Sequence, residues 1–139
     1  MNDPSINYAA ASATGTSPIG LVIRLYETVI SDLGRAITAI RDDDIERRTF
    51  ELQHALAVIG QLQGSLDMNK GQDPAKQLDR FYDVARARIV EAQIRFSGKI
   101  LEEVMRDFLL LRDTWVEVEK QTTRPPDPGS TPSSSAWVA

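Results

Sequence analysis

Hydrophobic residues recur three and four positions apart along most of the chain, which is the spacing that gathers them on one side of an α-helix. Ser17 and Pro18 precede the first such stripe. A serine oxygen can accept a free backbone N–H, and proline loses nothing at the first helical position. We therefore predict a helix from about Pro18 to Arg41. Its core-facing stripe consists of Ile19, Val22, Ile23, Tyr26, Ile30, Leu33 and Ile37.

A second helix is predicted to begin at the acidic stretch DDDIE and to end at about Leu66. Asp43 and Glu46 have the spacing of a capping box, and acidic residues suit the positive end of a helix. The stripe of this helix consists of Ile45, Thr49, Leu52, Leu56, Ile59 and Leu66.

Two further helices follow the loop DMNKGQDP. Gly71 interrupts the second helix, Asp73 is a candidate cap, and Pro74 suits the first position of the third. The stripe of the third helix consists of Leu78, Phe81, Tyr82, Ala85, Ile89, Ala92 and Phe96. Ser97 is the candidate cap of the fourth, whose stripe consists of Leu101, Val104, Met105, Phe108, Leu111, Trp115 and Val118.

No segment alternates between hydrophobic and polar residues, so no strand is predicted. Short joints make consecutive helices antiparallel neighbours. The predicted fold is therefore all-α, an antiparallel up-down four-helix bundle over residues 17–121. Residues 1–16 are small and polar, and we expect a flexible N-terminal segment there. Residues 122–139 are rich in proline and serine, and we expect a disordered tail.

The composition limits the classes of function. A net charge of −4 gives no general attraction to nucleic acid, so no nucleic-acid partner is expected. No apolar run approaches the roughly 20 residues that span a membrane, and the N-terminus lacks the features of a secretory signal. The absence of cysteine fits a reducing compartment. We expect a cytoplasmic protein that does not insert into membranes.

The best lead to catalysis is the pair Glu51 and His54, which has the Glu-x-x-His spacing of half a di-iron site on a bundle helix. A complete site needs a second such pair, and His54 is the only histidine in the chain. A solvated helix face explains the pair more simply. We expect no metal, no cofactor and no enzymatic activity, with a four-helix metalloenzyme as an alternative.

The helices carry more hydrophobic residues than one buried stripe each would use. Some of this surplus widens the core, because bundle helices bury up to half of their circumference. Taken together, it also indicates an apolar groove for a partner. The candidate groove residues are Leu21, Leu25, Phe50, Val58, Leu62, Val90, Ile94 and Leu110. Val29, Val84 and Leu109 also lie off the main stripes.

Several segments, taken in order, resemble the FliS family of flagellar export chaperones. They are Tyr8, TSP and LVIRLYE (Thr16 to Glu27), IGQLQGSLDMNKG (Ile59 to Gly71), LDRFYDVARARIVEAQI (Leu78 to Ile94) and ILEEVMRDFLLLRDTW (Ile100 to Trp115). Thr16 stands where the family usually has alanine before Ser-Pro, which is a mild departure. The tail after residue 121 matches nothing in the family.

The resemblance implies a cytoplasmic bundle that binds the disordered C-terminal segment of flagellin. It implies that binding prevents premature polymerisation and aids presentation to the export gate of the flagellar type III secretion apparatus. The off-stripe residues would then line the groove, and the free protein would be a monomer or a weak dimer.

The N-terminal segment is a candidate lid over this groove. Ile6 and Tyr8 are two positions apart and share a face in an extended segment. The resemblance likewise implies that this segment covers part of the groove when flagellin is absent. A frayed terminus is the alternative for this segment. For the whole protein, the alternative is a structural bundle that homodimerises through its surplus apolar strip.

Overall fold

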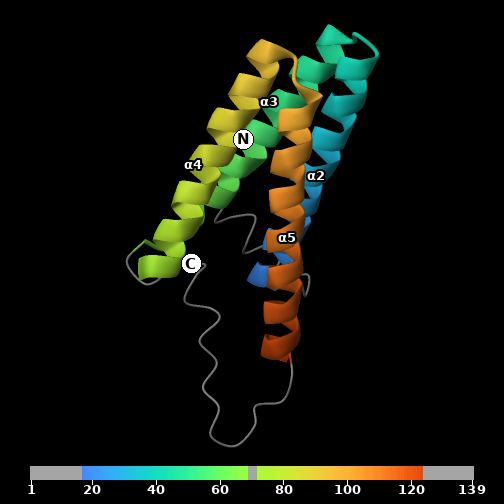
Figure 1. Ribbon diagram of the computed structural model, residues 1–139. Helices are drawn as coiled ribbons and strands as arrows, with labels where there is room; N and C mark the ends of the chain where they lie inside the picture. Colours follow the sequence, from blue (N-terminus) through green and yellow to red (C-terminus); the bar gives the residue numbers. More distant parts are fainter. Residues whose placement is uncertain (1–16, 69–71, 124–139) are drawn as a thin grey trace, which may run out of the picture.

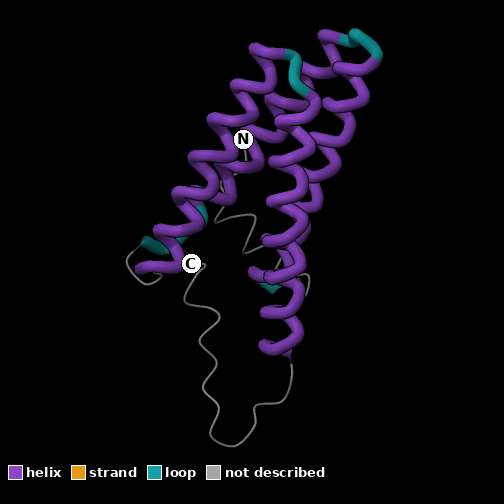
Figure 2. Tube along the Cα trace, in the orientation of Figure 1, coloured by secondary structure: helices purple, strands orange, loops and turns teal. Residues whose placement is uncertain are grey.

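The computed structural model describes residues 17–68 and 72–123, which form four helices: α2 (Pro18–Arg41), α3 (Ile45–Gly64), α4 (Gln72–Arg95) and α5 (Gly98–Thr123). Each helix runs antiparallel to the next (Figure 1), and no strand occurs in these two ranges (Figure 2). The predicted all-α four-helix bundle is confirmed. Residues 1–16 lie outside the described part, and α5 continues past the predicted boundary at residue 121.

Two serine caps form as the sequence predicts. Ser17 Oγ accepts a hydrogen bond from the Gly20 amide at 2.9 Å, and α2 begins with Pro18 at its first position. Ser97 Oγ accepts from the Ile100 amide at 3.2 Å at the start of α5. These bonds satisfy backbone donors that have no partner inside a helix.

The caps of the two middle helices differ from prediction. Asp44, not Asp43, caps α3, because its carboxylate accepts from the Arg47 amide at 3.0 Å. Asp43 adopts a left-handed φ of 53° and turns the chain between α2 and α3. Helix α4 already begins at Gln72, so Asp73 and Pro74 lie in its first turn and Asp73 is not the cap.

The core is drawn from all four helices, and α2 packs extensively against both α3 and α5. Tyr26 and Tyr82 are fully buried and hydrogen-bonded through their hydroxyls, and Phe108 packs edge-on against Tyr26 with centroids 5.2 Å apart. Trp115 is also buried in this cluster. Large aromatic side chains contribute much of the buried apolar area that stabilises such a core.

Some predictions about core membership are wrong. Ile45 and Phe96 belong to the predicted stripes, but each is more than half exposed at the end of its helix. Conversely, Val29 was expected off the stripe and is fully buried. Helix α2 has a neighbour on each side and therefore buries a wider arc than one stripe.

Candidate partner-binding surfaces

Two of the eight candidate groove residues are core residues. Val58 is 6% exposed and Leu62 is 1% exposed, and both belong to the central hydrophobic cluster. The expectation that they lie off the core is therefore wrong. Helix α3 packs between α2 and α4, so both of its flanks are covered.

Two other candidates are half-buried on α2. Leu21 and Leu25 are neither fully covered nor fully exposed, and Leu25 packs against the core cluster. Both leucines lie on the same flank of α2 as Asp32, which follows Leu25 by seven positions. Asp32 in turn contacts His54 of α3. These two leucines therefore lie toward the seam between α2 and α3.

The remaining four candidates are exposed but do not form one strip. Phe50 on α3, Val90 and Ile94 on α4, and Leu110 on α5 are between 44% and 71% exposed. Gln63 of α3 hydrogen-bonds to Asp83 of α4, and Val90 continues the flank of Asp83 one heptad later. Val90 and Ile94 thus lie toward α3, whereas Leu110 lies at the other seam of α4.

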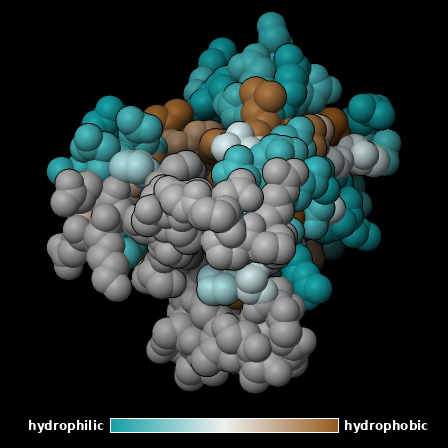
Figure 3. Space-filling model, turned by 90° about the horizontal axis from the view of Figure 1, so that it is seen from below, coloured by the Kyte–Doolittle hydropathy of each residue, from teal (hydrophilic) through white to brown (hydrophobic). Residues whose placement is uncertain are grey.

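A groove of about 670 Å³ lies between the N-terminal half of α4 and the C-terminal half of α5. It is lined by Pro74, Gln77, Leu78, Phe81, Asp107, Leu110, Leu111 and Thr114. We call it the α4–α5 groove. Asp107 is the one charged residue among these, and Leu110 is 68% exposed. Figure 3 views the bundle from the end nearer this groove and shows hydrophobic residues among the hydrophilic surface.

The groove contains residues that the sequence pattern assigned to the core. Phe81 and Leu111 were predicted on buried stripes, and both are only partly buried. Val84 is 52% exposed and follows Phe81 by three positions on the same flank. Arg88, four positions further, pairs with Glu103 of α5 at 2.5 Å. An apolar strip therefore runs along α4 up to this ion pair.

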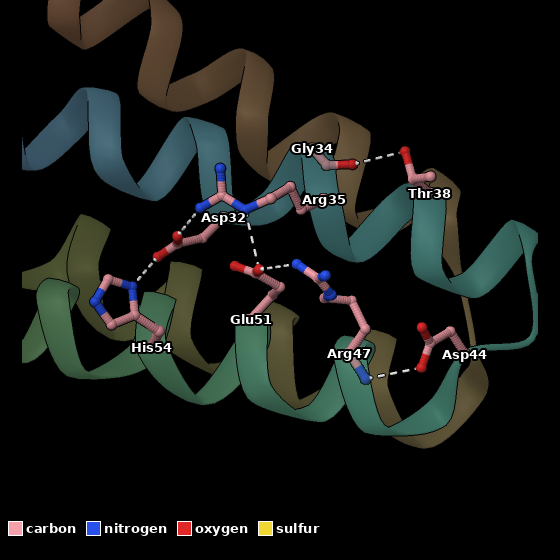
Figure 4. Close-up of polar contacts among 8 residues, drawn as sticks. All are labelled: Asp32, Gly34, Arg35, Thr38, Asp44, Arg47, Glu51 and His54. Atoms are coloured by element: carbon pink, nitrogen blue, oxygen red, sulfur yellow. Dashed lines mark hydrogen bonds and ion pairs between the residues drawn. The ribbon is translucent and has the colours of Figure 1, made fainter.

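The Glu-x-x-His pair belongs to a polar network between α2 and α3 (Figure 4). His54 Nδ1 lies 2.5 Å from Asp32 Oδ2. The guanidinium of Arg35 donates to the Asp32 carboxylate at 2.7 Å and to the Glu51 carboxylate at 3.0 Å, so it links the two acids. Arg47 also reaches Glu51 at 3.4 Å. Glu51 is buried and His54 is half-exposed, so the interpretation as a plain solvated face is wrong.

The polar side chains of this network pair with one another across α2 and α3. Both Glu51 and Asp32 are almost fully buried, and each contacts the guanidinium of Arg35. Burial raises the pKa of the Asp32 carboxyl, although the hydrogen bond with His54 acts in the opposite direction. Within the described ranges, no group of three or more histidine, aspartate or glutamate residues is placed to hold a metal ion. None of the four helices is long and apolar enough to span a membrane.

Comparison with known proteins shows the family to which this chain belongs. The model of the family "Flagellar protein FliS" matches residues 1–122. The chain belongs to the FliS family. The match includes all but the last residue of the described bundle, so the resemblance of the separate segments is confirmed.

Relatives from several bacteria share this family's name. The flagellar secretion chaperone FliS of Campylobacter jejuni is 29% identical over 116 residues, covering 84% of this chain and 91% of the relative. FliS of Bacillus subtilis is 28% identical over 115 residues, covering 83% and 85%. FliSB of Pseudomonas aeruginosa is 29% identical over 105 residues, covering 76% and 83%. FliS is thus a chaperone family of flagellum biogenesis and export.

Proposed function

We propose that the protein is a cytoplasmic secretion chaperone that binds the disordered C-terminal segment of flagellin. Binding would prevent premature polymerisation and help to present flagellin to the export gate of the flagellar type III secretion apparatus. Membership of the FliS family supports the class of function, because the relatives are named flagellar secretion chaperones. No cofactor takes part in this proposal.

The α4–α5 groove is the observation that carries the proposal. Leu110 exposes a large apolar side chain beside the partly buried Phe81 and Leu111. An amphipathic helix buries its apolar face in such a groove and leaves its polar face in water. Burying one leucine side chain is worth roughly 1.5–3 kcal/mol, so a few such contacts offset the cost of ordering a disordered client.

The other exposed candidates extend the proposed contact beyond one groove. Phe50, Val90 and Ile94 lie on α3 and on the α3-facing flank of α4, away from Leu110. A client that contacts both seams has to pass around α4. A disordered segment can wrap a surface in this way, whereas a preformed helix contacts one seam only. Leu21 and Leu25 are half-buried and would form a lesser part of the contact.

Ser17, the first described residue, lies at an end of the bundle from which the preceding lid segment could reach the α4–α5 groove. Ser17 Oγ lies 3.5 Å from Glu119 of α5, at the same end of the bundle as the α4–α5 groove. Tyr8 precedes Ser17 by nine residues, which span up to roughly 30 Å when extended. We propose that Ile6 and Tyr8 cover the groove until flagellin displaces them.

Light scattering of the purified protein with flagellin tests this function. We expect a 1:1 complex with full-length flagellin and no complex with flagellin that lacks its C-terminal segment. A stable homodimer that does not bind flagellin would instead support the alternative of a structural bundle that dimerises through Val90 and Ile94.

A further inference from the structure

A second cavity lies at the opposite end of the bundle, where the α2–α3 and α4–α5 turns meet (Figure 1). Its volume is about 460 Å³. We call it the turn cavity; it is lined by Ala39, Ile40, Asp43, Asp44, Ile45, Arg48 and Phe96. This volume falls within the range of sites that bind small ligands.

Two of these residues end helices in a left-handed conformation that usually requires glycine. Asp43 has a φ of 53° after α2, and Phe96 has a φ of 52° after α4. The Asp44 amide bonds to Ala39 O at 2.8 Å and the Ser97 amide to Ala92 O at 3.0 Å, which is the pattern of a Schellman cap. Aspartate tolerates this conformation, but a bulky aromatic residue is a rare exception.

Phe96 contributes little to the core at this strained position. Its side chain is 59% exposed, and the neighbouring Ile45 is 62% exposed across the cavity. Glycine would relieve the backbone strain and keep the turn. A residue that breaks a local rule without contributing to the core is characteristic of a functional surface.

The aromatic ring of Phe96 lies over a buried cation. Arg48 is 8% exposed, and its guanidinium carbon is 4.4 Å from the ring centroid of Phe96. Arg48 Nε is buried and has no hydrogen-bond partner. A buried donor without an acceptor costs free energy that a ligand acceptor can recover.

The rim of the turn cavity is acidic. The Asp44 carboxylate accepts a hydrogen bond from the Arg47 amide. The Asp43 carboxylate is exposed and forms no hydrogen bond or ion pair with the described residues. Asp42 is exposed beside it. The two carboxylates outnumber the one guanidinium in the lining, which favours a neutral acceptor for Arg48 and a cationic group for Asp43 over an anionic ligand.

We propose that the turn cavity docks a short segment of a partner protein that is both basic and apolar. One aliphatic side chain packs against Ile45 and Phe96, and a backbone carbonyl accepts from Arg48 Nε. A lysine or arginine of the segment pairs with Asp43. Because the cavity is at the other end of the bundle from the α4–α5 groove, the partner and a client in that groove can be bound together.

An NMR titration of the ¹⁵N-labelled full chain tests this proposal. The probe is acetyl-Ala-Lys-Leu-Lys-Ala-amide, and the control is acetyl-Ala-Glu-Leu-Glu-Ala-amide. We expect saturable shifts of the amides of residues 39–48 and 96–98 with the basic peptide, with a dissociation constant on the order of 1 mM for so short a probe. Equal shifts with both peptides, or none with either, would overturn the proposal.

Three variants separate docking from stability. Phe96→Gly relieves strain, so we expect an unchanged or higher melting temperature and roughly tenfold weaker binding of the basic peptide. Arg48→Met keeps the aliphatic stem and weakens binding by roughly three- to tenfold. Leu109→Ala removes an exposed apolar side chain that lines neither the turn cavity nor the α4–α5 groove, and it leaves binding unchanged. Wild-type affinity in a folded Phe96→Gly protein, or a lower melting temperature, would contradict the proposed role of the ring.

Discussion

The hydroxyls of Tyr26 and Tyr82 lie 2.7 Å apart in the centre of the bundle and join the diagonally opposed helices α2 and α4. Both side chains are fully buried, so neither hydroxyl can turn to water if its partner is removed. Burial also raises the pKa of Tyr26, which keeps its hydroxyl neutral and able to donate. This bond links two helices that are not packing neighbours in the bundle.

Tyr82→Phe should therefore destabilise the bundle by about 1–2 kcal/mol, because the buried Tyr26 hydroxyl loses one of its two side-chain hydrogen bonds and keeps the one with Trp115. Chemical denaturation followed by circular dichroism measures this change. The double variant with Tyr26→Phe should cost less than the sum of the single variants. Strict additivity would show that the two hydroxyls do not act as a pair.

Asp32 should give the bundle an unusual pH dependence. Burial raises the pKa of its carboxyl above the ordinary value of 3.8, so the folded state holds this proton more tightly than the unfolded state. By linkage, the Asp32 contribution is full below pH 3.8 and is lost as the pH rises through the folded-state pKa.

The measurement compares urea denaturation across pH in a His54→Gln background, which removes the imidazole that contacts Asp32. In this background, Asp32→Asn should abolish the part of the unfolding free energy that decreases as the pH rises. Glu103 is a natural contrast, because the hydrogen bond from Arg88 lowers its pKa and its contribution is lost as the pH falls. If the contribution of Asp32 to the unfolding free energy were instead lost as the pH falls, as for Glu103, the raised pKa of Asp32 would be contradicted.

Leu62 and Leu110 should respond in opposite ways to a carboxylate. Leu62→Asp places a charge in the core, where Leu62 is 1% exposed, and should cost at least ~3 kcal/mol or unfold the chain. Leu110 is 68% exposed, so Leu110→Asp should change stability by less than about 0.5 kcal/mol. Thermal melts by circular dichroism distinguish them, and similar melting temperatures would show that the assignment of core and groove is wrong.

Removal of the proposed lid should strengthen client binding. A chain that starts at Gly15 lacks Ile6 and Tyr8, so the closed state no longer competes with flagellin for the groove. Calorimetry with the flagellin C-terminal peptide should give a tighter dissociation constant than the full chain, and an apolar dye should bind more strongly to the free protein. Unchanged affinity and dye binding would count against the lid and leave the chaperone proposal intact.

The fold was predictable because its determinants are local. Ser17-Pro18 and Ser97 mark helix starts by hydrogen bonds within one turn, and these signals do not depend on the partner helices. Among the adjacent acids at 42–44, by contrast, several spacings fit a cap. The left-handed turn at Asp43 decides in favour of Asp44, and this turn is not visible in a hydrophobic pattern.

The candidate site was less predictable because exposure depends on which helices are neighbours. Val58 and Leu62 lie off the main stripe of α3 but are covered by adjacent helices. The link from His54 to Asp32 spans 22 positions and depends on the register between α2 and α3. The family resemblance identified the chaperone class, whereas the position of the α4–α5 groove came from the packing.

The most direct test of the central proposal is a calorimetric titration of three full-length proteins with the flagellin C-terminal peptide: wild type, Leu110→Asp and Leu109→Asp. Leu109 is the matched control, because it is adjacent on α5 and exposed but does not line the α4–α5 groove. A carboxylate in the groove must be desolvated when the client binds, so we predict at least about tenfold weaker binding for Leu110→Asp and near wild-type binding for Leu109→Asp. Equal affinity of the wild type and a folded Leu110→Asp protein would contradict the account.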